Sequence, residues 1–161
     1  MTALHQLFGG ELPRLVMFDL DGTLLDSVPD LAAAIDRMLG QLGRPPAGVA
    51  KVRDWVGNGS KVLVRRALAD DLDHSAITDE QAAPAHQLFL SAYADCHALS
   101  TVYPGVRECL DWLQARAVPL ALVTNKPTQF VGPLLAEKGL DGYFRWVLGG
   151  ARLPVQKPDP A

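Results

Sequence analysis

A short apolar run that ends abruptly in charged residues restricts the fold of this chain more than any other feature. Residues 15–18 (LVMF) are all apolar, and Asp19, Leu20 and Asp21 follow them directly. A continuous apolar run of this length is typical of a strand that is covered on both faces, as in parallel sheets. The pattern therefore predicts a buried strand with two aspartates at its carboxyl end.

Two later segments extend the predicted sheet. Residues 118–123 form a second apolar run that ends in Thr124 and Asn125, and residues 145–148 resemble a third strand. A helical pattern precedes the second run, with Val106, Cys109, Leu110 and Leu113 on its buried face. Because strands that alternate with helices favour right-handed crossovers, we expect an α/β fold with a Rossmann-like parallel sheet.

The chain between the first two strands reads as helical. Ser27 to Asp30 fits a capping box, and Gly43 supplies a stop for the first helix. Residues 61–69 and 80–99 are two further predicted helices. We therefore expect a helical cap over residues 27–103, inserted between two core segments, residues 1–26 and 104–161. The face of the first helix that we expect to be buried carries Leu31, Ile35, Met38, Leu39 and Leu42.

Another helix is expected to begin at Pro127, after the second strand. Gly132 and Pro133 lie within it, and proline removes one hydrogen bond from a helix interior. The pattern predicts a kink or an early break at this pair. Gly139 is expected to close the helix.

Charge and hydropathy exclude several classes of function. The chain has 161 residues and a formal net charge of −3, without the basic excess that nucleic-acid binding requires. Its apolar runs are far shorter than the ~18 residues of a membrane span, and its start lacks a secretory signal pattern. Cys96 and Cys109 lack metal-ligand spacing, which favours packing roles in a reducing compartment. We expect a cytoplasmic protein that binds neither nucleic acid nor membrane.

The two aspartates belong to a longer string with a specific resemblance. On its own, Asp21-Gly22 is as typical of a tight turn as of a reaction centre. Residues 18–27 (FDLDGTLLDS), however, resemble the first motif of the haloacid dehalogenase superfamily of phosphohydrolases. The resemblance implies that Asp19 is the nucleophile, that Asp21 is the general acid/base, and that both take part in holding Mg²⁺. Mg²⁺ prefers oxygen ligands and would offset the repulsion between a carboxylate and a phosphate ester.

Two more segments resemble later motifs of the same family. Residues 123–126 (VTNK) resemble the second motif, whose hydroxyl residue bonds the transferring phosphoryl group. Residues 156–160 (QKPDP) resemble the third motif, whose lysine balances negative charge. Taken alone, a threonine at this position is typical of a helix cap, and a lone lysine is typical of a solvated surface. The phosphate-binding residues that the resemblance implies are Gly22, Thr23, Thr124, Asn125 and Lys157.

One loop of the helical insert is similar to the cap loop of phosphoglycolate-phosphatase-like members. It lies in residues 53–60 (RDWVGNGS) and contains two glycines, which permit a close backbone approach to a ligand. An ordinary turn between helices remains an alternative. The resemblance implies a small phosphorylated metabolite, 2-phosphoglycolate above all, as substrate. The implied specificity residues are Gly57, Asn58, Gly59, Ser60 and Lys61.

The fourth motif of the family, which supplies a further acidic metal ligand, is absent from the 161 residues. We therefore interpret the chain as an amino-terminal portion of a phosphatase, with an incomplete sheet and metal site. Two alternatives stay open: a phosphomutase similar to β-phosphoglucomutase, and a non-catalytic portion that self-associates through an open edge at residues 15–18. Transfer of phosphate to a sugar would identify the first, and Mg²⁺-dependent turnover would exclude the second.

Overall fold

The core of the protein is a parallel sheet of three strands. The structure, a computed structural model, describes residue 6, residues 9–150 and residue 157. The strands are β1 (Val16–Phe18), β4 (Leu120–Val123) and β5 (Trp146–Leu148), in the order β1-β4-β5. Phe18 pairs with Leu122, and Leu122 pairs with Val147. The predicted α/β class and the parallel sheet are confirmed.

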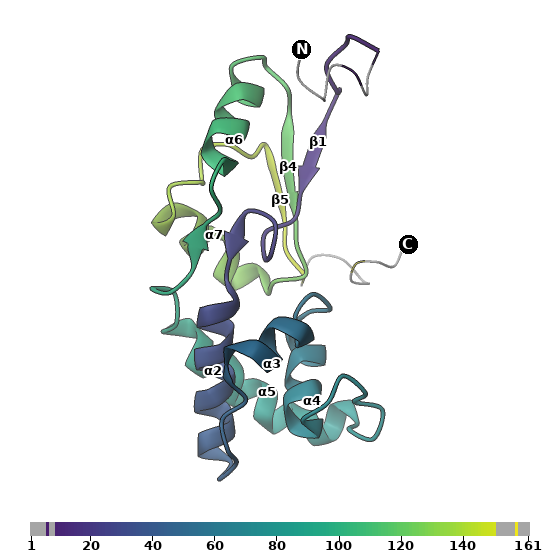
Figure 1. Cartoon of the computed structure of the whole chain (residues 1–161), viewed down its shortest axis with the longest axis vertical. Coiled ribbons are helices and arrows are strands. Elements are labelled where there is room, and N and C mark those ends of the chain that lie inside the picture. Colours follow the sequence, from purple (N-terminus) through teal and green to yellow (C-terminus); the bar gives the residue numbers. More distant parts are fainter. Residues whose placement is uncertain (1–5, 7–8, 151–156, 158–161) are drawn as a thin grey trace.

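Two helices cover one face of this sheet (Figure 1). They are α6 (Val106–Gln114) and α7 (Thr128–Glu137), whose buried leucines pack against Leu120 and Leu122. Of the predicted kink or early break in α7, the kink stays a prediction, and the early break is wrong, because the helix continues through Pro133. Its apolar face is buried on both sides of that residue, and this packing outweighs one missing hydrogen bond. Cys109, expected on the buried face of α6, is exposed.

The opposite face of the sheet is partly bare. Met17, Ala121 and Trp146 lie in one row across the three strands. Met17 is 67% exposed and Trp146 is 45% exposed, so the prediction that β1 is covered on both faces is wrong. Within the described residues, the row has no helix packed over it comparable to α6 and α7 on the other face.

Four helices form a separate cluster beyond the carboxyl ends of the strands (Figure 1). They are α2 (Val28–Gln41), α3 (Gly48–Trp55), α4 (Ser60–Ala69) and α5 (Asp79–Ala94), joined by a shared apolar core. The sequence patterns predicted α2, α4 and most of α5, which ends at Ala94 instead of continuing to residue 99. They did not predict α3. In the part of the chain that the structure describes, these helices are too short or too polar to cross a bilayer.

A two-stranded antiparallel ladder joins this cluster to the sheet. It consists of β2 (Leu25–Asp26) and β3 (Thr101–Val102). Beside it, the carboxylate of Asp30, only 1% exposed, accepts hydrogen bonds from the amides of Leu99 and Ser100 at 3.0 and 2.7 Å and from the Ser100 hydroxyl. The chain passes from the sheet into the helical cluster near β2 and returns near β3. One buried carboxylate therefore holds these two crossings together.

The predicted capping box at the start of α2 is wrong. Ser27 is the N-cap residue, but its side chain makes no capping hydrogen bond. Its hydroxyl instead donates to Asp21, and Asp30, the expected partner in the box, bonds the second crossing. Ser27 and Asp30, which match a local helix cap, thus bond the loop after β1 and the segment before β3 instead.

Candidate active site

A tight loop after β1 positions the two predicted aspartates. The amides of Leu24 and Leu25 both donate to the carbonyl of Leu20 at 3.0 Å, and the Gly22 amide donates to Leu25 at 2.8 Å. Gly22 has φ +80, a conformation that side chains disfavour. The turn interpretation of Asp21-Gly22 and the functional one are therefore compatible, since the turn places Asp21 beside Asp19 at the sheet edge.

One cavity collects most of the predicted site residues. Asp19, Asp21, Thr124 and Asn125 line it from the sheet side. The cap loop contributes Gly57, Gly59 and Ser60 to the same cavity.

Five predicted residues do not line this cavity: Gly22, Thr23, Asn58, Lys61 and Lys157. Gly22 and Thr23 are exposed, and their amides donate within the loop, to Leu25 and Leu20. The side-chain amide oxygen of Asn58 accepts a hydrogen bond from Arg66 at 3.1 Å, and Lys61 lies on a neighbouring depression beside His86. Gly22 and Thr23 thus serve the turn, while Asn58 and Lys61 face other surroundings; the binding roles expected of these residues stay predictions.

Asp19 lies against the lysine that the third motif predicted. Its Oδ1 atom is 3.0 Å from Nζ of Lys157 and accepts the Leu20 amide hydrogen at 2.8 Å. The Lys157 ammonium also donates to the carbonyl of Val123 at 2.7 Å. Both contacts use Oδ1, and no described residue bonds Oδ2 of Asp19, which is therefore available to a ligand.

Asn125 joins three segments of the site. Its amide nitrogen donates to the carbonyls of Gly57, at 3.2 Å, and of Lys157, at 3.0 Å. Its amide oxygen accepts from the Lys157 backbone at 2.9 Å. These contacts place Asn125 as a residue that orients Lys157 and touches the cap loop. Direct phosphate contact by Asn125 stays a prediction.

Thr124 is buried at the end of β4. Its hydroxyl oxygen accepts the amide hydrogen of Lys126 at 3.1 Å. This contact leaves the hydroxyl hydrogen able to donate into the cavity, which the side chain lines. The geometry suits the phosphoryl contact that the second motif implies.

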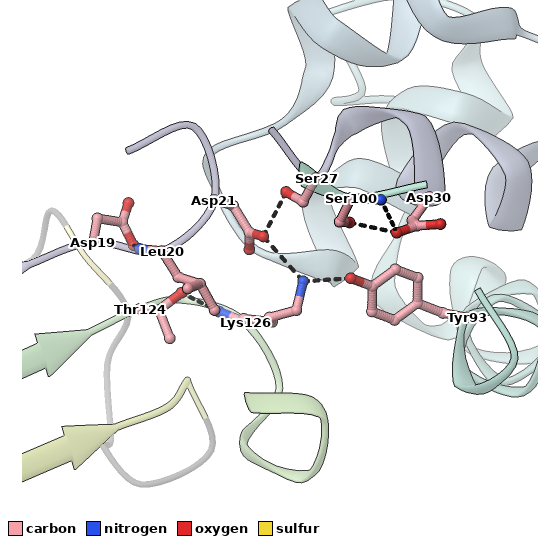
Figure 2. A network of polar contacts seen from close by, with 9 residues as sticks. All are labelled: Asp19, Leu20, Asp21, Ser27, Asp30, Tyr93, Ser100, Thr124 and Lys126. Atoms are coloured by element: carbon pink, nitrogen blue, oxygen red, sulfur yellow. Dashed lines mark hydrogen bonds and ion pairs between the residues drawn. The ribbon is translucent and has the colours of Figure 1, made fainter. Parts of the chain in front are cut away.

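Asp21 belongs to a second network, shown in Figure 2. Its Oδ1 atom accepts from the Ser27 hydroxyl at 2.6 Å and lies 3.0 Å from Nζ of Lys126. Lys126 is 4% exposed and also donates to the hydroxyl of Tyr93, on α5. Burial opposes the charge on Lys126, but Asp21 and Tyr93 outweigh it and raise the pKa of the ammonium. For the Tyr93 phenol, burial acts in the opposite direction and raises the pKa, so the phenol keeps its proton.

Ser27, Tyr93 and Lys126 are the residues that sequence reasoning missed. Lys126 lies inside the second motif, and a charged residue between Asn125 and Pro127 was the available signal. Ser27 was interpreted as part of a helix cap, and Tyr93 lies within the predicted helix of residues 80–99, where no local pattern marks its hydroxyl. Only the tertiary structure shows that their hydroxyls meet the Asp21 network.

A neutral histidine, His86, orients a hydroxyl group on the cap side of the cavity. Nε2 of His86 lies 2.9 Å from the hydroxyl of Ser60. Burial, aided by the nearby charge of Lys61, lowers the pKa of His86. The neutral imidazole can therefore accept the Ser60 hydrogen and hold this hydroxyl at the cavity wall.

The loop after β5 packs against Asn125 so closely that only glycine fits. A Cβ atom on Gly150 would lie 2.5 Å from the Asn125 carbonyl oxygen, and the Gly150 amide donates to Lys126 at 2.9 Å. We expect Gly150→Ala to lower the free energy of unfolding by about 1–3 kcal/mol, measured by urea denaturation. Gly142→Ala is the matched control, because its added methyl group meets nothing within 4 Å. Equal effects of the two substitutions would contradict the close approach.

The donor set fits Mg²⁺ in part. Among the residues that the structure describes, no group of three or more histidine, cysteine or acidic side chains converges on one point. Mg²⁺ is nevertheless commonly held by one or two carboxylates, with substrate phosphate and water completing its shell. The Asp19 carboxylate and the Asp21 carbonyl are oxygen donors of this kind at the cavity.

The fold and the cavity together define an α/β domain with two aspartates at the carboxyl end of a strand, beneath a cluster of helices. Residues 13–161 match the model of the haloacid dehalogenase-like hydrolase family, and the chain belongs to this family.

Relatives and solved structures agree with this family. A phosphoglycolate phosphatase of Pseudomonas putida KT2440 is 62% identical over the whole chain, and phosphoglycolate phosphatase 1 of Pseudomonas aeruginosa PAO1 is 60% identical. The chain covers 59% of the length of each. The crystal structure of a predicted phosphoglycolate phosphatase from Haemophilus somnus 129PT superposes with a TM-score of 0.82 at 39% identity, covering 91% of this chain and 67% of that one.

Proposed function

We propose that this chain carries the nucleophile, the general acid/base and the cap of a phosphatase that hydrolyses a small phosphomonoester, with 2-phosphoglycolate as the preferred substrate. The observation that carries the proposal is the single cavity shared by Asp19, Asp21, Thr124 and the cap loop. The relatives named as phosphoglycolate phosphatases support the choice of substrate. On this proposal, residues 27–103 are the cap and residues 1–26 and 104–161 are the core.

In the proposed reaction, the free Oδ2 of Asp19 attacks phosphorus. A bond forms between this oxygen and phosphorus, the bond to the ester oxygen breaks, and Asp21 gives its proton to the departing alkoxide. Thr124 and Lys157 bind the phosphoryl oxygens. Water then attacks the phosphorus of the aspartyl-phosphate, Asp21 takes the proton, and Asp19 is regenerated.

We also propose that Mg²⁺ is held by the Asp19 carboxylate and the Asp21 carbonyl. When bound, the ion supplies positive charge that offsets the repulsion between the nucleophile and the phosphate. Lys157, at 3.0 Å from Asp19, supplies part of the same compensation from the protein.

Phosphate release from 2-phosphoglycolate with Mg²⁺ tests the proposal. The assay compares this chain with a chimera in which it is continued by the part of the Pseudomonas putida relative that the match does not cover. We expect turnover by the chimera, with 2-phosphoglycolate preferred over sugar phosphates. Chimera activity confined to other phosphate esters would contradict the substrate, and an inactive, folded chimera would contradict the function.

We further propose that the 161-residue chain associates with a second copy through its sheet. The exposed Met17 and Trp146 form an apolar row with Ala121, and β1 is an edge strand of the described sheet. Such edges pair readily with other strands. We expect sedimentation velocity to show a dimer that Met17→Lys converts to monomer, with Val49→Lys, an exposed position on α3, as the control. A concentration-independent monomer would contradict association.

The proposed cellular location is the cytoplasm. Both Cys96 and Cys109 are free thiols, and free thiols are typical of a reducing compartment. The small phosphorylated metabolite proposed as substrate is consistent with this location.

A further inference from the structure

The buried ammonium of Lys126 has no part in the phosphoryl contacts described so far. A charge this deeply buried costs several kcal/mol unless it is paired and hydrogen-bonded. Its partners among the described residues are the Asp21 carboxylate, at 3.0 Å, and the Tyr93 hydroxyl, and it also lies 4.7 Å from the centre of the Tyr93 ring. Lys126 is thus held by one residue of the core and one residue of the helical cluster.

Tyr93 is itself held in place by aromatic packing. Its ring stacks on Phe89 at 5.6 Å between ring centres and meets Phe130 edge-on at 5.1 Å. Phe89 lies on the same helix, α5, whereas Phe130 lies on α7 of the core. The hydroxyl of Tyr93 therefore reaches Lys126 only while α5 is seated against the core.

The contacts of Asp21 are divided unequally between its two oxygens. Ser27 and Lys126 both donate to Oδ1, and no described residue donates to Oδ2. Figure 2 shows the chain of contacts running from Ser27 through Asp21 and Lys126 to Tyr93. The two donors hold the carboxyl group in one orientation and leave Oδ2 for proton transfer.

We propose that Lys126 and Tyr93 are positioning residues, which together orient the carboxyl group of Asp21 for proton transfer when helix α5 is seated on the core. The inference rests on the proposed role of Asp21 as general acid/base. It adds a link between the cap and the proton donor: moving α5 away removes the Tyr93 contact, and Lys126 then no longer holds Asp21 in place.

A pair of substrates separates this role from a merely structural one. p-Nitrophenyl phosphate has a leaving group that departs without a proton, whereas phenyl phosphate has a more basic one that depends on the acid. We measure the first-turnover release of each phenol by the chimera with Mg²⁺, for the parent, Tyr93→Phe, Lys126→Met and Lys126→Arg. Tyr143→Phe is the matched control, since it removes the hydroxyl of a half-buried tyrosine, bonded to the exposed Asp111, that does not line the cavity.

We expect Lys126→Met to slow phenyl phosphate cleavage by about 100-fold and p-nitrophenyl phosphate cleavage by less than about threefold. Tyr93→Phe should show the same selective loss at about tenfold, and Lys126→Arg should recover part of it. Tyr143→Phe should match the parent. Equal losses on both substrates, or no loss on either, would overturn the proposal. Because neither substrate is 2-phosphoglycolate, an error in the proposed substrate leaves this test intact.

A second measurement is independent of activity. Urea denaturation of the 161-residue chain gives the free energies of unfolding of Tyr93→Phe, Lys126→Met and the double variant. If the two side chains act together, the free energy lost by the double variant should be smaller than the sum of the two single losses. Additive losses would contradict the link between the cap and the core.

Discussion

Asp19→Asn is expected to lower the kcat of the chimera for phosphate release by about 10⁴-fold or more. Asparagine has nearly the shape of aspartate, but its amide is neutral and does not attack phosphorus. The contacts of Lys157 with the carbonyl of Val123 and with Asn125 remain in place, so the cavity keeps its other groups. The measurement is steady-state phosphate release with 2-phosphoglycolate and Mg²⁺.

The matched control for this variant is Asp54→Asn. Asp54 is exposed on α3, outside the cavity. Its substitution by asparagine replaces the same carboxylate by the same amide without touching the site. It should retain the parent activity, and both variants should unfold at nearly the parent urea concentration. Full activity of Asp19→Asn would show that another group attacks phosphorus.

Asp30→Ala is expected to lower the free energy of unfolding by about 4 kcal/mol. The substitution removes the acceptor of three hydrogen bonds and leaves the amides of Leu99 and Ser100 and the Ser100 hydroxyl without it. These groups lie where both crossings between the helical cluster and the sheet meet. Their desolvation is no longer compensated, which is why the loss is large.

Urea denaturation measures this effect, with Asp36→Ala as the control on the same helix. Asp36 accepts two backbone hydrogen bonds, from Ala47 and Gly48, but it is only half-buried. We expect the control to cost about 1–2 kcal/mol. A loss for Asp30→Ala no greater than that of the control would contradict the role of Asp30 as the clamp between the two crossings.

The core of the site was predictable because its residues are contiguous in the chain and follow strand ends. Asp19 and Asp21 come directly after β1, and Thr124 directly after β4. Carboxyl ends of parallel strands meet at one sheet edge, so local patterns were sufficient to bring these side chains together. The loop glycines Gly57 and Gly59 lie between two helices and were predicted on a different ground, the resemblance of residues 53–60 to a cap loop.

The second network was not predictable from local patterns, because each member has a common local explanation. Ser27 precedes a helix, where serine is typical of a cap, yet its hydroxyl bonds Asp21 six residues earlier. Tyr93 is a buried residue of α5, and the packing of its ring against Phe89 and Phe130 is sufficient to explain an aromatic residue there. Lys126 and Asp21 are 105 residues apart in the chain, and a contact at that separation leaves no periodic signal.

The helices and strands also divide into those that local patterns predicted and those that they did not. Long amphipathic helices such as α2 and the apolar strands were predicted, whereas α3, with eight residues, and β3, with two, were not. Short elements carry too few periods for their pattern to stand out, and β3 exists because it pairs with β2. Pro133 misled in the other direction, since packing on both sides of it keeps α7 continuous.

The most direct test of the central claim is a crystal structure of the chimera with Mg²⁺ and beryllium fluoride, which mimics a phosphoryl group on a carboxylate. We predict beryllium bonded to a side-chain oxygen of Asp19, with the Thr124 hydroxyl and the Lys157 ammonium in contact with the fluorides. Beryllium bonded to Asp21 or to any other side chain, with Asp19 left bare, would contradict the assignment of Asp19 as the nucleophile.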